Sequence, residues 1–81
     1  MIKLEQTTSA YPEQYDAFIN NKCIGYLRLR HGYFYCKFLP TNEIIYETRT
    51  KGRGCFDLNE REFHLNIACL ALIEKFAQGG Y

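Results

Sequence analysis

Residues 22–39 read KCIGYLRLRHGYFYCKFL, and this stretch decides the fold. Two runs rich in aliphatic and aromatic residues flank the step His31-Gly32. Glycine readily adopts the positive φ that a tight hairpin turn needs, and histidine tolerates it better than most other residues. The stretch therefore predicts a long β-hairpin that turns at His31-Gly32.

A two-residue turn also fixes which residues face each other across the hairpin. Side chains alternate between the two faces of a strand, so counting outward from the turn sorts them into two sets. One set is apolar and suits a core: Leu27, Leu29, Phe34, Cys36 and Phe38. The other set pairs cations with tyrosines at three successive positions: Tyr26, Arg28, Arg30, Tyr33, Tyr35 and Lys37.

Two interpretations of the second set stay open. Tyrosines and long cations can cover a solvated sheet, with each cross-strand pair adding about 0.2–1 kcal/mol. Alternatively the set is a binding surface, because Tyr and Arg are enriched among the residues that dominate protein interfaces. A surface on which the bases of single-stranded nucleic acid stack has a similar composition.

Short connections extend the hairpin into an antiparallel meander. Residues 15–19 predict a strand that joins the hairpin through Asn20-Asn21, and residues 43–49 predict another after a loop at 40–42. We expect three or four strands in this meander, and residues 2–4 are a further short candidate outside it. With a two-residue Asn20-Asn21 turn, Phe18 faces Cys23 on the core face; a three-residue loop would instead put its neighbours Ala17 and Ile19 there.

The C-terminal part predicts one helix at residues 58–78 that packs on the core face. Asp57 with Glu60, or Asn59 with Glu62, has the spacing of a capping box, and Gly79-Gly80 offers a glycine cap. His64 falls on a narrow polar strip, so we expect it at the surface.

The helix carries two apolar stripes, whereas a surface helix of a monomer usually has one. The first stripe is Phe63, Ile67, Leu70 and Ala77, with Ile73 beside it. Either the sheet wraps the helix, or the second stripe meets another chain in a homodimer. That second stripe, the expected oligomer interface, is Leu65, Cys69, Leu72 and Phe76.

A basic loop at residues 50–57 precedes the helix. Lys51 and Arg53 alternate there with two glycines, and we interpret the segment as a mobile loop beside the tyrosine-rich face. A cradle for an anion at the helix start is the alternative, although a lone Gly-x-Gly is a weak signal. Residues 22–53 hold seven Lys and Arg against two Glu, a balance of +5 in a chain of net charge +1, and such a patch favours an acidic partner.

Length and composition indicate how many domains the chain has and whether it enters a membrane. The 81 residues form one small α+β domain: a partly flexible segment at 1–13, the meander at 15–49, the basic loop at 50–57 and the helix at 58–78. No apolar run is long enough to span a membrane, and the first 14 residues lack the apolar core of a signal peptide, so we expect a cytoplasmic protein.

The polar residues form no recognisable catalytic or metal-binding pattern. The four cysteines have no C-x-x-C or zinc-finger spacing, and we expect free structural thiols without a metal. No nucleophile-histidine-acid set and no nucleotide-binding loop is visible, so we expect no enzyme activity and no cofactor.

One resemblance bears on function. The run GYLRLRHG at residues 25–32, followed by Ile45-Tyr46-Glu47, Gly52, Gly54, Cys55-Phe56 and Glu60-Arg61-Glu62, resembles a group of small uncharacterised proteins of bacteriophages and mobile elements. The resemblance implies a phage product that acts inside a bacterial cell by binding a host component, such as a CRISPR or other defence complex.

Three functions are therefore weighed. The first is a non-enzymatic protein that occupies a host protein or nucleoprotein surface, as an anti-defence or anti-CRISPR-like inhibitor does. The alternatives are a single-stranded nucleic-acid-binding domain and a homodimeric structural protein assembled through the helix. The expected contact residues are Tyr26, Arg28, Arg30, Tyr33, Tyr35, Lys37, Lys51 and Arg53.

Overall fold

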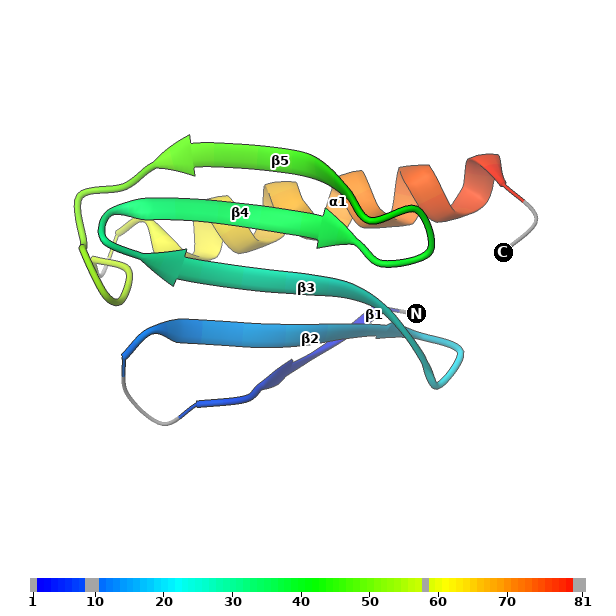
Figure 1. Cartoon of the computed structure of the whole chain (residues 1–81), viewed down its shortest axis with the longest axis horizontal. Coiled ribbons are helices and arrows are strands. Elements are labelled where there is room, and N and C mark those ends of the chain that lie inside the picture. Colours follow the sequence, from blue (N-terminus) through cyan, green and yellow to red (C-terminus); the bar gives the residue numbers. More distant parts are fainter. Residues whose placement is uncertain (1, 9–10, 58, 80–81) are drawn as a thin grey trace.

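The computed structural model describes residues 2–8, 11–57 and 59–79, which form a five-stranded antiparallel sheet and one helix (Figure 1). The strands lie in the order β1-β2-β3-β4-β5, so the α+β meander is confirmed. The elements are β1 (Ile2–Gln6), β2 (Glu13–Ile19), β3 (Lys22–Arg30), β4 (Tyr33–Phe38), β5 (Glu43–Arg49) and α1 (Arg61–Gln78).

The sheet has five strands, whereas three or four were predicted. β1 pairs with β2 from Ile2 opposite Ile19 to Gln6 opposite Tyr15. Its alternating side chains explain the pairing, because Ile2 and Leu4 are partly buried against the core while Lys3 and Glu5 are exposed. The short candidate at residues 2–4 is therefore a complete edge strand.

The central hairpin has the predicted register. His31 and Gly32 have φ values of 55° and 73°, as a two-residue turn with both central residues left-handed requires. All six expected pairs are present, from Arg30 opposite Tyr33 to Gly25 opposite Phe38. The apolar and tyrosine-rich sets therefore lie on opposite faces of the sheet.

The sequence left two assignments of the β2 faces open, and the structure combines the two-residue turn of one with the core face of the other. The Asn20-Asn21 turn has two residues, as expected, but the register shifts between Ala17 and Phe18. Ile24 is the extra residue on β3, and this bulge moves Cys23 and its partner Phe18 off the core face. Ala17 and Ile19 are buried instead, at 0% and 6% exposure.

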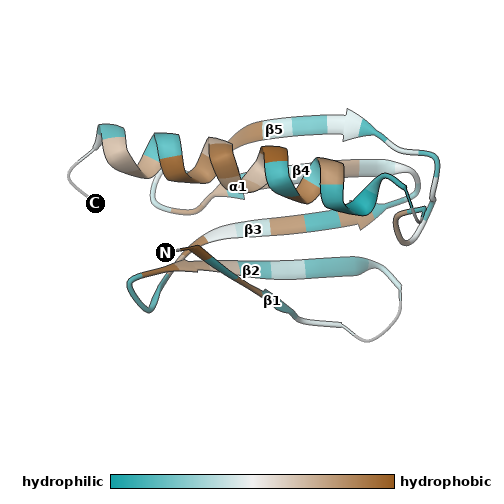
Figure 2. Cartoon of the chain, turned by 180° about the vertical axis from the view of Figure 1, so that it is seen from behind, coloured by the Kyte–Doolittle hydropathy of each residue, from teal (hydrophilic) through white to brown (hydrophobic). Residues whose placement is uncertain are grey.

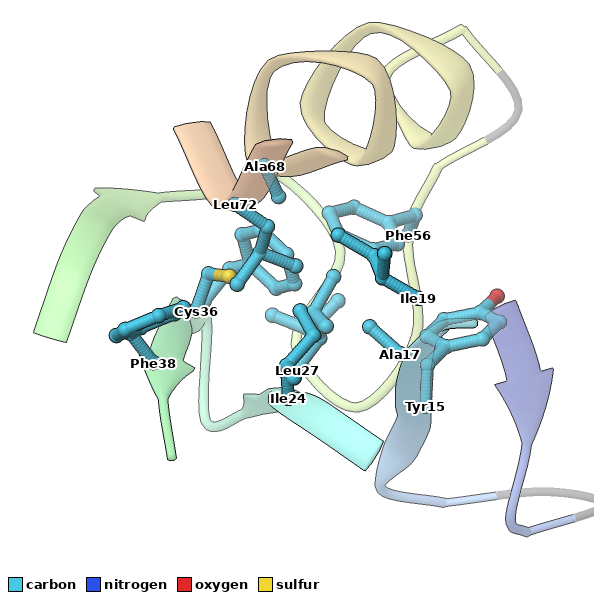
Figure 3. Packing of buried hydrophobic residues seen from close by; sticks show 12 residues of the cluster. Tyr15, Ala17, Ile19, Ile24, Leu27, Cys36, Phe38, Phe56, Ala68 and Leu72 are labelled. Atoms are coloured by element: carbon cyan, nitrogen blue, oxygen red, sulfur yellow. The ribbon is translucent and has the colours of Figure 1, made fainter. Parts of the chain in front are cut away.

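The core lies between the inner face of the sheet and α1. Leu27, Leu29, Phe34, Cys36 and Phe38 are all fully buried, as the hairpin register predicts. Figure 3 shows Ala68 and Leu72 reaching from the helix into this layer. Close approach depends on Gly25, because a Cβ there would lie 2.8 Å from Leu72 Cδ1.

The helix covers one face of the sheet and leaves the other open. It runs along β4 and β5 on the inner side (Figures 1 and 2). No other element of the described chain covers the outer face, which is turned to the viewer in Figure 1. No helix in the described ranges is long and apolar enough to cross a membrane.

The helix begins later than predicted and ends at Gly79, where the sequence predicts a glycine cap. Its N-cap is Glu60, which makes no side-chain capping bond, because its carboxylate accepts the Asp57 N–H at 2.9 Å in a turn before the helix. Gly79 is the C-cap in an extended conformation, with φ −116°, and Gly80 lies outside the described residues.

Candidate binding surface on the outer sheet face

Six side chains from the central hairpin form what we call the tyrosine–arginine face: Tyr26, Arg28, Arg30, Tyr33, Tyr35 and Lys37. The strand alternation points all of them away from α1. Arg30 is exposed and the other five are half-buried, so they pack beside one another while keeping a surface to solvent. The structure thus brings together the whole hairpin set that the sequence predicts.

The three tyrosines form a packed row across β3 and β4. The ring centres of Tyr26 and Tyr35 are 6.1 Å apart, and those of Tyr33 and Tyr35 are 5.8 Å apart. Both pairs are tilted, a favourable arrangement for aromatic rings. Burial raises the pKa of Tyr26, and its hydroxyl stays protonated in the neutral range.

Two residues of β5 complete the face. Arg49 places its guanidinium 5.4 Å from the centre of the Tyr33 ring, and the Tyr33 hydroxyl donates to Glu47 Oε1 at 2.6 Å. The bond to Glu47 raises the pKa of Tyr33. The site prediction missed both residues, although the alternation of Glu47 and Arg49 with Tyr46 and Thr48 was a usable signal.

The cations of this face are poorly neutralised. Arg28 Nε is buried and has no hydrogen-bond partner in the described chain. Arg28, Arg30 and Arg49 also line a hollow of about 290 Å³, together with His31, Tyr33 and Tyr35. A buried polar group without a partner is costly, so an acceptor supplied by a ligand would be favourable here.

The basic loop is held by an internal anion. The carboxylate of Glu60 accepts the N–H groups of Lys51 at 3.0 Å, Gly52 at 2.9 Å and Asp57 at 2.9 Å. Burial alone would raise the pKa of Glu60, but these bonds outweigh it and lower the pKa. The backbone cradle considered for an external anion is therefore already filled, and the loop we expected to be mobile is tied to the helix start.

The two predicted contact residues of this loop differ in position. Arg53 lines a hollow with Arg30 and His31, next to the tyrosine–arginine face. Lys51 is exposed and lies outside the lining of that hollow. The structure thus brings Arg53, but not Lys51, up to the hairpin cations.

A buried ion pair, absent from the sequence prediction, positions this loop and the helix. Glu13 accepts two bonds from Arg61, at 2.8 Å from Nε and 3.1 Å from the terminal nitrogen. The Phe56 N–H donates to it at 3.0 Å, and the Tyr15 hydroxyl also donates to it. Glu13 is 2% exposed, so β2, the loop and α1 meet at one buried carboxylate.

These contacts shift the pKa values of Glu13 and Tyr15. Burial would raise the pKa of Glu13, but the bonds from Arg61, Tyr15 and Phe56 outweigh it and lower the pKa. Burial and the bond to Glu13 raise the pKa of Tyr15 to about 12. The sequence signal was weak because Glu13 follows a polar, proline-containing segment that we had not assigned to a strand.

His64 is not on the surface, contrary to our expectation. Its side chain is 12% exposed and lies among aromatic rings, with the Phe56 ring stacked at 5.8 Å and the Phe34 ring at 6.3 Å. Its Nδ1 shares a hydrogen bond of 2.9 Å with the Tyr46 hydroxyl. The histidine therefore joins the helix to the inner side of the sheet.

The stripe expected at an oligomer interface, Leu65, Cys69, Leu72 and Phe76, covers the sheet instead. Leu72 is fully buried, and Leu65 and Phe76 pack against the core. On the side of the helix that faces β1, Leu65 and Cys69 line a hollow together with Leu4. The outward side of α1 carries the other stripe, with Phe63 at 62% and Leu70 at 67% exposure.

The comparisons with known proteins assign this chain to no family. No family model, no curated protein and no solved structure matches this chain. All four cysteines are free thiols, and no group of three His, Cys, Asp or Glu within the described ranges could hold a metal ion.

Proposed function

We propose that this chain is a non-enzymatic binding protein that docks its tyrosine–arginine face on an acidic surface of another protein. One observation carries the proposal: an uncovered sheet face that presents a packed row of three tyrosines together with Arg28, whose buried Nε has no acceptor among the described residues. Tyr and Arg are the residue types that most often dominate binding energy, especially where they are already packed and partly desolvated.

The geometry favours a protein partner over single-stranded nucleic acid. Base stacking needs an open ring face. Arg49 already lies over the Tyr33 ring, and Tyr35 has a tilted tyrosine ring on either side. The acidic residues Glu47 and Asp16 lie opposite Tyr35 and Tyr26 in the strand register, which gives a mixed surface of the kind that proteins present to one another.

The resemblance to small phage and mobile-element proteins suggests the setting. A phage product of this kind would occupy a host protein or nucleoprotein surface, including one of a defence complex, inside the bacterial cytoplasm. The partner would contribute carboxylates to Arg28 and Arg30, and charge-assisted bonds of this type are shorter and stronger than neutral ones.

Affinity capture from bacterial lysate tests the proposal. Arg28→Glu/Tyr35→Ala changes the face without touching the core, and Lys3→Glu/Phe63→Ala is a matched control that reverses one charge and removes one ring elsewhere. We expect a partner that the wild type and the control capture and the face variant loses. If the face variant keeps every captured protein, the proposal fails.

A gel-shift assay with single-stranded DNA distinguishes the nucleic-acid alternative from the protein-binding proposal. At about 50 mM salt, electrostatic binding to single-stranded DNA is strong, and it falls steeply as salt is added. A shift that the face variant abolishes, with no protein partner lost, would replace the proposal by nucleic-acid binding.

A further inference from the structure

The hollow that Arg53 lines lies where three distant segments of the chain meet, at the end of the sheet that holds the His31-Gly32 turn. It has a volume of about 430 Å³, within the range of small-molecule sites. We call it the corner hollow, and its lining residues are Tyr11, Pro12, Arg30, His31, Arg53 and Gly54.

Backbone hydrogen bonds hold these segments together. The Gly32 N–H donates to the Arg53 carbonyl at 2.8 Å, and the Thr50 N–H donates to the Gly32 carbonyl at 2.9 Å. The Glu13 N–H donates to the Gly54 carbonyl at 2.8 Å. The lining side chains therefore project from a fixed frame, so little ordering is needed when a ligand binds.

The charge of the corner hollow is positive and unbalanced. Arg30 and Arg53 line it with His31, and no carboxylate is part of the lining. Among the described residues, the ion pairs go to Lys3, Arg61, His64 and Lys75, and neither corner arginine is in one. Two guanidinium groups on one hollow suit a phosphate, whose oxygens accept their paired N–H donors.

An aromatic ring forms another wall. Tyr11 is 72% exposed, more than Leu70 and Phe63, the other large hydrophobic side chains that are mostly exposed among the described residues. Its ring lies directly on Gly54, where an added Cβ would collide with the Tyr11 ring. The ring is thus backed by the loop and keeps a surface on which a planar group can stack.

We propose that the corner hollow binds a nucleoside monophosphate, with the phosphate on Arg30 and Arg53 and the base on Tyr11. This site differs from the backbone cradle of the loop, which Glu60 fills. It adjoins the tyrosine–arginine face, since Arg30 and His31 line both hollows, but it does not depend on the proposed protein partner. Arg53 and Tyr11 line the corner hollow but not the hollow on the tyrosine–arginine face, so variants at these two residues test the corner hollow alone.

Titration with adenosine 5′-monophosphate, inorganic phosphate and adenosine, followed by amide chemical shifts in 100 mM salt, tests the proposal. The monophosphate should bind about tenfold or more tightly than inorganic phosphate, because its base can stack on the Tyr11 ring and inorganic phosphate has no such group. Arg53→Gln should weaken both phosphate ligands about tenfold or more, as loss of a charge-assisted bond implies. Shifts should centre on the amides of residues 11, 13, 30–32 and 53–54.

Matched variants make the result decisive. Tyr11→Leu should weaken the monophosphate and leave inorganic phosphate unchanged, whereas Tyr11→Phe, which keeps the ring, should retain both affinities. Lys51→Gln removes a neighbouring cation outside the hollow and should change little. No shift with the monophosphate at millimolar concentration would overturn the proposal. So would equal losses in Arg53→Gln and Lys51→Gln, or unchanged monophosphate binding in Tyr11→Leu.

Discussion

The buried carboxylate of Glu13 gives the sharpest stability prediction. Glu13→Gln keeps the shape of the side chain but replaces one carboxylate oxygen by an amide nitrogen. Glu13 now accepts from Phe56, from Tyr15 and twice from Arg61. One amide oxygen cannot serve four donors, and the amide brings two donors of its own.

The magnitude follows from which donors lose their acceptor. A buried donor left unpaired costs about 1–3 kcal/mol. The Arg61 side chain is 42% exposed and can rehydrate, so we discount its share and expect a total loss of about 2–4 kcal/mol. A chain of this length has a stability of roughly 4–12 kcal/mol, so the variant should fold but be clearly weakened.

Urea unfolding followed by far-UV circular dichroism measures the effect. With a slope of about 1 kcal/mol/M, the midpoint at pH 7 should fall by about 2–4 M at an unchanged slope. Glu74→Gln, at an exposed position on α1, should stay within about 0.5 kcal/mol of the wild type. A Glu13→Gln midpoint equal to that of the control would refute the role of the buried pair.

The pH dependence provides a second check of the same pair. The folded-state pKa of Glu13 is lowered, so its stabilisation is complete above the unfolded value of about 4.3 and is lost as the pH falls through the folded value. The free-energy difference between the wild type and Glu13→Gln should therefore be largest near neutral pH and shrink in acid. A difference that grows toward pH 3 would contradict this assignment.

Three further predictions concern the helix, the loop and a thiol. Gly25→Val should cost about 1–3 kcal/mol in urea unfolding, because its Cβ would lie 2.8 Å from Leu72 Cδ1 and 3.1 Å from Ala17 Cβ; equal stability would contradict the close packing. Glu60→Gln should speed hydrogen exchange at the Lys51 and Gly52 amides, whose acceptor it weakens, and unchanged protection there would show that the carboxylate does not hold the loop. Burial raises the pKa of Cys36 to about 12, so mass spectrometry should find this thiol alkylated only in denaturant, and rapid native labelling would count against its burial.

The sequence predicts most of the central hairpin because local chemistry determines it. Both turn residues tolerate positive φ, and the strict alternation on either side leaves one register that buries the apolar set. The faces of β2 could not be read in the same way. They depend on a bulge at Ile24, which places one extra residue on one strand without a distinctive local sequence signal.

The parts of the candidate sites also differ in whether local sequence or the tertiary structure determines them. The tyrosine–arginine face comes from alternation within one hairpin and was predictable. The Glu13–Arg61 pair, the aromatic neighbours of His64 and the corner hollow each join segments far apart in the chain, so they depend on how the loop and α1 fold back on the sheet. The site prediction therefore missed two cations of this chain, Arg49 over the Tyr33 ring and Arg61 on Glu13.

Site-specific photo-crosslinking tests the central claim, that the tyrosine–arginine face is the binding surface, most directly. The aromatic crosslinker p-benzoylphenylalanine is introduced at Tyr35 on that face or, as a control, at the exposed Leu70 on the opposite side of the molecule. After irradiation in bacterial lysate, we predict a discrete protein adduct from position 35 that Arg28→Glu abolishes, and none from position 70. An adduct from position 70 alone, or a position-35 adduct that Arg28→Glu leaves unchanged, would contradict the claim.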